Sequence, residues 1–563
     1  MGELLDELRG VGTADEKSRA SGAAVLGARL REEFMRSGVR FVATPSRLAD
    51  VHRAAAERLA DCLDTDGRGR PVLQEGGVYK GCWLESTGTI NAELLSRFCP
   101  SVAEATFEQF ADGQRSDGLI PYKVTAGSPV FKQIQLVTPP ARSVWNHYRL
   151  NGSAAGAANE GSRLEWLRKM YGALSRYDGW LAANRDTRGT GAVEAFCAFD
   201  TGHDLSPRFW HVPDAPYGGD PARFDPNSPI LPFVAPDLTA SVHANRRHLA
   251  LMAEELGDGA AADEWRRKAE RSLRSLIDYC YDEEDGFFYD VDAAGRFVRV
   301  QSDVLLRVLA CEVGDGAFFA SSLSRYLLNT RKFYSKYPFV SIALDDPRFD
   351  PSSAYNSWAG PVNFLSLIRA PHAFERHGRH VELTWVMQPI LSALSRMTRF
   401  GQTLSPWTGE EGYTEAYSPA ILCALDFTER ICGIQPTPDG ELRFTGLLPS
   451  SVDHGAPVAT ETAYSRTVDG VVCELHNTPE ECFAYRDGKL WCRFPAGLRL
   501  VTDRRGELKR VIGMTVREVK GTLRMEAEGR EIPVRIKGNE VWRLEHGRLA
   551  LDSAMGVVLP TYG

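Results

Sequence analysis

The chain of 563 residues lacks a long apolar run and an excess of positive charge. No stretch approaches the roughly 18 consecutive apolar residues of a membrane-spanning helix, so we expect no membrane partner. The first twenty residues carry several carboxylates and no apolar block, which predicts that no secretion signal is present. The net charge of −8 gives no electrostatic footprint for nucleic acid.

Closely spaced metal-binding cysteines are also lacking. The tightest of the eleven cysteines, Cys423 with Cys432 and Cys473 with Cys482, do not have the two-residue spacing of a zinc site. An odd number of scattered thiols is typical of reduced, mostly buried cysteines in the cytosol. We therefore expect structural thiols, no metal and a cytoplasmic protein.

A loop rich in Gly and Pro, residues 200–209, carries a candidate catalytic carboxylate, Asp204. Residues 164–181 before it and 238–256 after it have apolar side chains at helical spacing, which predicts a helical hairpin with this loop as its turn. Catalytic groups favour loops on a rigid scaffold, and a carboxylate there suggests acid/base chemistry. Taken alone, however, Asp204 is better interpreted as a turn former before Ser-Pro.

The wider pattern of this loop resembles that of six-hairpin glycosidases, notably glycoside hydrolase family 63 and the mannosylglycerate and glucosylglycerate hydrolases. Their loop reads roughly Glu-Ser-Gly-x-Asp-Asn-Ser-Pro-Arg, and its Asp is the general acid. Asp200 stands here in place of the Glu and Leu205 in place of the Asn, while the matching residues are Gly202, Asp204, Ser206, Pro207 and Arg208. The resemblance covers most of residues 76–433 and implies that Asp204 is the general acid.

The organisation of the chain changes at about residue 434. Helical patterns recur in pairs before it, which fits either a solenoid or a closed toroid, and the resemblance implies an (α/α)6 toroid barrel. After it, apolar and polar residues alternate between turns, as in a sandwich-like β-rich domain. We therefore expect a mainly α chain with an N-terminal helical segment packing on the barrel (1–75), a catalytic barrel (76–433) and a C-terminal β-sandwich domain (434–563).

Hydrolysis of a glycosidic bond normally needs a second carboxyl group. Many of the resembling enzymes read Glu-x-Tyr-x-Pro-x-Thr-Gly-Glu, with the first Glu as the base. Residues 406–410 match this pattern, but Gln402 occupies the base position, and a neutral amide cannot deprotonate water. Glu415 has tyrosines on both sides in the same loop and is the preferred base, with Glu411 as the alternative.

Other side chains are candidates for sugar binding, because aromatic rings supply contact area and polar groups bond to hydroxyls. Residues 114–122 resemble a Gln-x-x-Asp-Gly-x-Ile-Pro loop at the pocket rim of six-hairpin enzymes. Residues 355–361 resemble their Tyr-Trp-Arg-Gly-Pro segment, although Ala359 replaces the Arg. The expected substrate-binding residues are Trp83, Glu85, Gln114, Asp117, Tyr122, Arg208, Trp358, Trp407 and Tyr417.

These features and the resemblance predict an exo-acting glycoside hydrolase that needs no cofactor and takes a small carbohydrate, with Asp204 as acid and Glu415 as base. The resemblance implies that it works by inversion. A sugar phosphorylase or epimerase on the same barrel is an alternative, since phosphorylases replace the base with a phosphate site. A non-catalytic sugar-binding protein is a third hypothesis.

Overall fold

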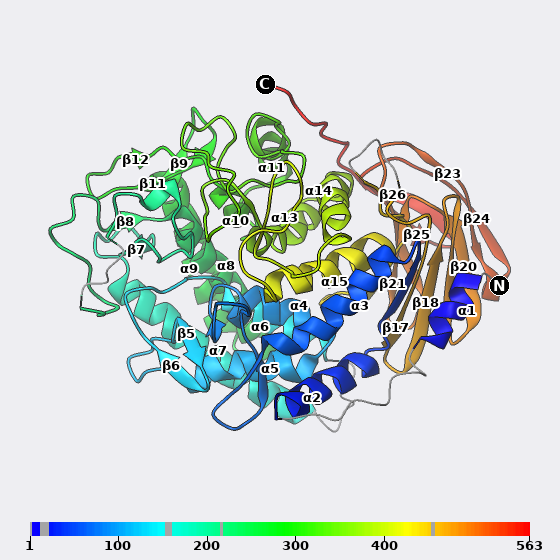
Figure 1. Cartoon of the computed structure of the whole chain (residues 1–563), viewed down its shortest axis with the longest axis horizontal. Helices are drawn as coiled ribbons and strands as arrows, with labels where there is room; N and C mark the ends of the chain where they lie inside the picture. The colour runs from blue at the N-terminus through cyan, green and yellow to red at the C-terminus, as the bar shows by residue number, and fades with distance from the viewer. Residues whose placement is uncertain (1–2, 12–21, 153–159, 214–217, 452–456) are drawn as a thin grey trace.

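The computed structural model describes residues 3–11, 22–152, 160–213, 218–451 and 457–563, and a helical part packs there on a β-rich part (Figure 1). The two parts share one hydrophobic core, in which Ile431 of the last helix lies with Phe444 of a sheet. The chain is 38% helix and 23% strand, more mixed than the mainly α chain that we expected. Among the described residues, no helix combines the length and apolar character needed to cross a membrane.

The helical part contains inner and outer helices. α8 (Pro236–Glu255) is buried over most of its surface, whereas α9 (Gly259–Cys280) buries a stripe at helical spacing that includes Ala262, Trp265 and Ala269. A helix buried all round lies in the interior, and a helix with one apolar stripe lies at the surface. The predicted helical hairpin around Asp204 is confirmed, because α7 (Glu160–Asn184) packs against α8.

Six helical segments run in the same direction. The N-terminal ends of five of them, together with Arg307 of the sixth, line two cavities joined by the ion pair of Arg307 with Glu85, and residues in or just beyond their C-terminal halves line a third cavity. Proline in the first turn, which is preset for a helix start, begins several of them. The segments are η2 (Thr87–Asn91) with α4 (Ala92–Leu95), α6 (Pro140–Leu150), α8, α10 (Val304–Leu309), α12 (Phe364–Leu367) with α13 (Ala370–Arg376), and α15 (Ser418–Cys432).

The other helices of this part and the short strands in its loops complete the scaffold. The helices are α2 (Gly22–Arg36), α3 (Arg47–Arg58), α5 (Pro100–Asp112), α11 (Gly316–Ser322) and α14 (His380–Leu394). The short strands are β2 (Leu63–Thr65), β3 (Pro71–Leu73), β4 (Cys82–Trp83), β5 (Lys123–Thr125), β6 (Ser128–Val130), β7 (Glu194–Ala195), β8 (Phe233–Val234), β9 (Tyr281–Asp282), β10 (Phe287–Phe288), β11 (Asp290–Val291), β12 (Phe297–Val298), β13 (Val362–Asn363) and β14 (Thr403–Leu404).

The expected β-rich C-terminal region forms two antiparallel sheets, the first of which also includes the N-terminal strand β1 (Arg40–Thr44), with strand orders β1-β17-β18-β19-β20-β23-β24 and β15-β16-β21-β22-β25-β26. The rings of Phe444 and Trp491, one from each sheet, lie 5.5 Å apart, so the sheets pack face to face. Their strands are β15 (Ile434–Pro436), β16 (Glu441–Thr445), β17 (Glu461–Val468), β18 (Val471–Asn477), β19 (Glu481–Arg486), β20 (Lys489–Pro495), β21 (Leu498–Asp503), β22 (Leu508–Gly513), β23 (Val519–Met525), β24 (Arg530–Ile536), β25 (Glu540–Glu545) and β26 (Arg548–Ala554).

The N-terminal segment joins the β-rich part rather than only packing on the helices. β1 (Arg40–Thr44) pairs antiparallel with β17, with Arg40 opposite Ser465. The apolar side of α1 (Glu3–Gly10) packs on the same sheet, next to Val42 and Tyr485. Residues 12–21 of the expected N-terminal helix lie outside the described residues, and the division at residues 75 and 433 stays a prediction.

Glu375 joins the helical part to the β-rich part. This α13 carboxylate forms ion pairs with Arg430 at 2.8 Å, Arg443 at 2.6 Å and Arg499 at 3.0 Å. Burial opposes its ionisation, but the three arginines outweigh burial and hold the pKa of Glu375 well below its usual range. A lowered folded-state pKa stabilises the fold above the unfolded pKa, and that stabilisation is lost as the pH falls through the folded pKa.

We predict that Glu375→Gln lowers the free energy of unfolding by about 3–5 kcal/mol, because it leaves buried guanidinium groups without their carboxylate. Glu32→Gln is the control: its exposed pair with Arg36 should contribute about 0–1 kcal/mol. Urea unfolding at neutral pH measures both variants. Equal stability of the two variants would contradict this account of the junction.

Candidate active site

Asp204 lies in a cavity of about 310 Å³, called the Asp204 pocket below. Three carboxyl groups line it, those of Glu75, Glu85 and Asp204. Its aromatic walls come from distant parts of the chain and are formed by Tyr79, Trp83, Tyr122, Phe199, Trp358 and Tyr417. A mostly apolar cavity with a few convergent polar groups is the usual form of a small-molecule site.

The start of the Asp204 loop is fixed by a buried ion pair. Arg185 and Asp200 are fully buried and lie 2.5 Å apart. The Asp200 carboxylate also accepts hydrogen bonds from the backbone N–H groups of Gln135 and Phe196, at 2.8 and 2.7 Å. Asp200, which stands in place of the Glu of the resembling enzymes, is therefore an anchor for the loop.

The end of the loop is fixed by Arg208. Its guanidinium bridges Asp290, through two hydrogen bonds of 2.8 Å, and Asp237, at 3.0 and 3.1 Å. It also bonds to the ring of His203. Arg208 was expected to bind substrate, but it is buried beneath the loop and does not line the pocket.

The surroundings of Asp204 suit a general acid. Burial raises its pKa to about 7, the nearby Glu85 carboxylate adds to this, and a hydrogen bond from Asn356 opposes it. That bond runs from Asn356 Nδ2 to Asp204 Oδ2 over 2.6 Å. A carboxyl group with such a pKa is partly protonated at neutral pH and can donate a proton.

Trp358 forms a wall beside Asp204, as its sequence segment suggested. Its backbone N–H donates to the Asp204 carbonyl oxygen at 3.1 Å. The His203 ring contacts it with a centroid distance of 4.5 Å, and the Arg307 guanidinium lies 5.0 Å from its ring centre. The indole is thereby fixed in one orientation.

Gln402 lies in the Asp204 pocket, at the position that the resemblance gives to the base. Its Oε1 accepts a hydrogen bond of 2.9 Å from the Tyr79 hydroxyl, and its Nε2 donates one of 3.2 Å to Asn356 Oδ1. A chain of hydrogen bonds therefore links Tyr79, Gln402 and Asn356 to Asp204. It orients the Asp204 carboxyl group but contains no second carboxylate.

Glu415, the expected base, does not share the pocket with Asp204. Its side chain is 63% exposed, lies 3.8 Å from Arg58 and lines a separate surface hollow. Thr414 and Ala416 on either side have positive φ angles of 61° and 45°, and this turn of the backbone directs Glu415 outward. The alternative, Glu411, accepts bonds from the backbone N–H groups of residues 398 and 399 and is a loop anchor.

The structure brings together five of the nine expected substrate-binding residues. Trp83, Glu85, Tyr122, Trp358 and Tyr417 line the Asp204 pocket. The other four have different surroundings: besides Arg208, Gln114 bonds to the carbonyls of Gly118 and Ala173, Asp117 bonds to Arg115 and Trp180, and half-exposed Trp407 contacts Phe349.

Sequence reasoning missed Glu75 and Tyr79 as pocket residues and Asn356 as the hydrogen-bond partner of Asp204. Glu75 directly precedes Gly76 and Gly77 after a turn-rich stretch, and such a pair of glycines next to a carboxylate was the available signal. Asn356 lies in the segment that was noted for Trp358. Nothing in the local pattern shows that Tyr79 and Gln402 meet across the fold.

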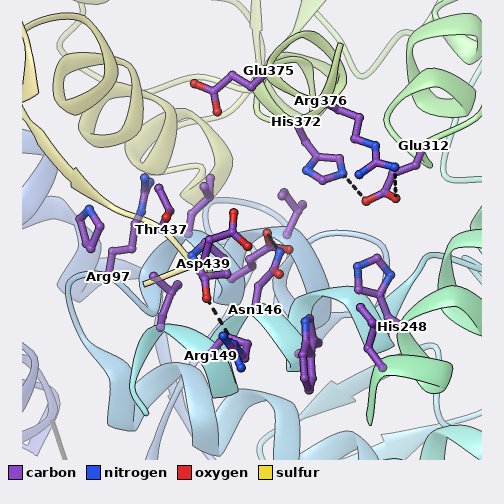
Figure 2. A pocket seen from close by; sticks show the side chains of 18 of the residues that line it. Arg97, Asn146, Arg149, His248, Glu312, His372, Glu375, Arg376, Thr437 and Asp439 are labelled. Atoms are coloured by element: carbon purple, nitrogen blue, oxygen red, sulfur yellow. Dashed lines mark hydrogen bonds and ion pairs between the residues drawn. The ribbon is translucent and has the colours of Figure 1, made fainter. Parts of the chain in front are cut away.

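A larger cavity of about 920 Å³ lies at the C-terminal ends of the six segments, and its charged groups largely pair with one another. Figure 2 shows Glu312 bonded to both His372 and Arg376, at 3.1 and 3.7 Å. Burial would raise the pKa of Glu312, but His372, His248 and Arg247 hold it well below its usual range. A carboxylate held ionised in this way is a poor proton donor or acceptor near neutral pH, so this cavity is less suited to acid/base catalysis than the Asp204 pocket.

Leu205, next to the acid, has a strained backbone. Its φ is 58° and its side chain is 56% exposed. The left-handed conformation costs a residue with a Cβ about 1–2 kcal/mol, and Asn tolerates it better. We predict that Leu205→Asn raises the stability to urea by about 1 kcal/mol, whereas Leu205→Ala, which keeps the strain, does not. Equal stability of the two variants would contradict the assigned conformation.

Comparison with known proteins identifies the family. Residues 80–418 match the mannosylglycerate hydrolase MGH1-like glycoside hydrolase domain. A search of curated protein sequences finds no match. The structure of the GH63 mannosylglycerate hydrolase from Thermus thermophilus in complex with Tris is 20% identical, with 67% of this chain and 100% of that chain covered and a TM-score of 0.56.

Two further structures share the fold at lower identity. A sialidase is 14% identical and covers 88% of this chain and 44% of its own, with a TM-score of 0.61. A GH78 family rhamnosidase of Bacillus sp. GL1 is 12% identical and covers 78% of this chain and 40% of its own, with a TM-score of 0.51. Because the matched domain spans more than half of the 563 residues, the chain belongs to the mannosylglycerate hydrolase MGH1-like glycoside hydrolases and is a six-hairpin glycosidase.

Proposed function

We propose that the chain is an exo-acting, inverting glycoside hydrolase of a small glycoside or oligosaccharide, with Asp204 as the general acid. The observation that carries this proposal is the environment of Asp204, a carboxyl group with its pKa raised to about 7 in an aromatic pocket. The cavity volume of about 310 Å³ is at the lower limit of the range for small-molecule sites. It supports a substrate of which only one end enters the pocket.

The proposal also includes the barrel architecture, the domain bounds and the cellular location of the enzyme. The common direction of the six inner segments supports their closure into an (α/α)6 barrel with the site at one end. The barrel would comprise residues 76–433, between the N-terminal segment and the C-terminal domain. All eleven cysteines are buried and unpaired, which supports a reducing, cytoplasmic location. A small carbohydrate is the only partner proposed.

In the proposed reaction Asp204 protonates the glycosidic oxygen as the bond to the anomeric carbon breaks. Trp83 and Trp358 supply apolar area for the sugar, and Glu85 is placed to accept hydrogen bonds from its hydroxyls. Glu85 is paired with Arg307 at 2.7 Å and lies 3.7 Å from Arg369. These cations balance the charge of the Glu85 carboxylate and orient it, so we assign it to binding rather than to proton transfer.

We predict that Asp204→Asn lowers turnover of an unactivated disaccharide by about 10²–10⁴, which is typical of general-acid removal. Activated aryl glycosides, whose leaving groups need no proton, should be largely spared. Asp263→Asn, at an exposed carboxylate on α9, is the control. Initial rates on the two substrate classes measure the effect, and full activity of Asp204→Asn on the disaccharide would remove Asp204 from the mechanism.

The pH dependence follows from the same assignment. Asp204 must be protonated to act as acid, so kcat/KM should fall as the pH rises through about 7, the pKa of Asp204. On an activated aryl glycoside, Asp204→Asn should lose this alkaline limb, because no leaving-group proton is required. An alkaline limb that persists unchanged in the variant would show that another group carries it.

A further inference from the structure

We infer that Glu75 is the general base of this glycosidase. The amide of Gln402 cannot accept a proton from water, and Glu415 lies outside the pocket. The inference rests on the proposed function and adds the second carboxyl group to it. Glu75 lines the Asp204 pocket with Gln402 and Tyr417 and is 5% exposed. It lies 129 positions before Asp204 in the chain, and the fold brings the two into one cavity.

Elimination among the carboxyl groups of the pocket leads to Glu75. Three of them line it. Asp204 is assigned as the acid, and Glu85 is held by two guanidinium groups. Among the residues that the structure describes, no Lys or Arg forms an ion pair with Glu75, so its lone pairs are not occupied by a fixed cation.

Two hydroxyl groups orient the Glu75 carboxylate. Ser86 Oγ donates a hydrogen bond to Glu75 Oε2, and the Tyr417 hydroxyl also bonds to the carboxylate. Hydroxyl donors direct a carboxylate without neutralising its charge. Burial raises the pKa of Glu75 to about 7 despite these two bonds, which is near the optimum for a base that works at neutral pH.

The loop that carries Glu415 holds Glu75 in place. The backbone N–H of Ser418 donates to the Glu75 carbonyl oxygen at 2.8 Å. A Cβ at Gly76 would overlap the carbonyl oxygen of Ala416, and one at Gly77 would overlap Thr414. Both glycines have positive φ angles, of 97° and 57°. Only glycine permits this close approach, which fixes the backbone of Glu75 against the loop while its side chain lines the cavity.

The reaction step balances with water as the sole co-substrate. The Glu75 carboxylate takes a proton from water as the water oxygen forms a bond to the anomeric carbon. The bond from that carbon to the aglycone oxygen breaks, and Asp204 gives its proton to the leaving oxygen. Glu75 is then protonated and Asp204 ionised, and a proton passes through solvent from the former to the latter. The products are the free sugar, of inverted configuration, and an alcohol.

The test is Glu75→Gln, assayed on an unactivated disaccharide and on an activated aryl glycoside. We expect kcat to fall by about 10²–10⁴ on both substrates, because water must be activated in each case. In the residual activity the acid limb of the pH profile should be absent and the alkaline limb retained. Glu75→Asp, which keeps a carboxylate, should keep the acid limb at reduced kcat and covers the case in which the amide variant fails to fold.

Glu57→Gln, at an exposed residue of α3, is the control. Glu415→Gln tests the competing assignment of the base. A normal acid limb and rate in Glu75→Gln, or loss of turnover in Glu415→Gln alone, would overturn the inference while the proposed function stands. Turnover that requires added phosphate would also overturn it, because phosphate would then be the nucleophile. If the wild type hydrolyses no glycoside and Asp204→Asn changes nothing, the proposed function itself fails.

Discussion

Two buried arginines hold the loop on which the chemistry of this protein depends. Arg185 fixes the loop at Asp200, and Arg208 fixes it at Asp237 and Asp290. Loss of one partner from a buried ion pair typically costs about 3–5 kcal/mol, so these contacts strongly favour one position of the loop. A loop held in this position keeps Asp204 against Asn356 and inside the pocket, and burial there raises its pKa. The contacts of Arg185 and Arg208 thus fix the loop, and the fixed loop keeps Asp204 buried with a raised pKa.

Three residues that depart from the pattern of the resembling enzymes lie in or next to the segments that form this site. Gln402 removes the base from its usual position and becomes part of the hydrogen-bond chain that orients the acid. Ala359 removes an arginine, while Arg307 lies over the neighbouring Trp358 ring and pairs with Glu85. Leu205 replaces an Asn and keeps a left-handed backbone. Asp204 and Arg208 match the pattern of the resembling enzymes, whereas Gln402, Ala359 and Leu205 around them do not.

The sequence predicted the features that are coded locally. The loop with Asp204, the helices on both sides of it and the switch to strands after residue 434 follow from short patterns and were confirmed. The outward direction of Glu415 was not predictable, because Thr414 and Ala416, rather than glycines, take the left-handed conformation. Glu75 was missed, and Arg208 was expected at the pocket but does not line it, because tertiary contacts alone decide which side chain reaches the pocket. The pairing of β1 with β17 could not be predicted either, because it joins strands that lie far apart in the chain.

The central claim is that two carboxyl groups act on opposite sides of the glycosidic bond with water between them. Proton NMR of the first-formed sugar, recorded before mutarotation while the wild-type enzyme hydrolyses a single-anomer glycoside, tests it most directly. The account predicts that the anomer opposite to that of the substrate appears first. First release of the same anomer as in the substrate would contradict it, because it would require a covalent glycosyl-enzyme and a nucleophile in place of a base.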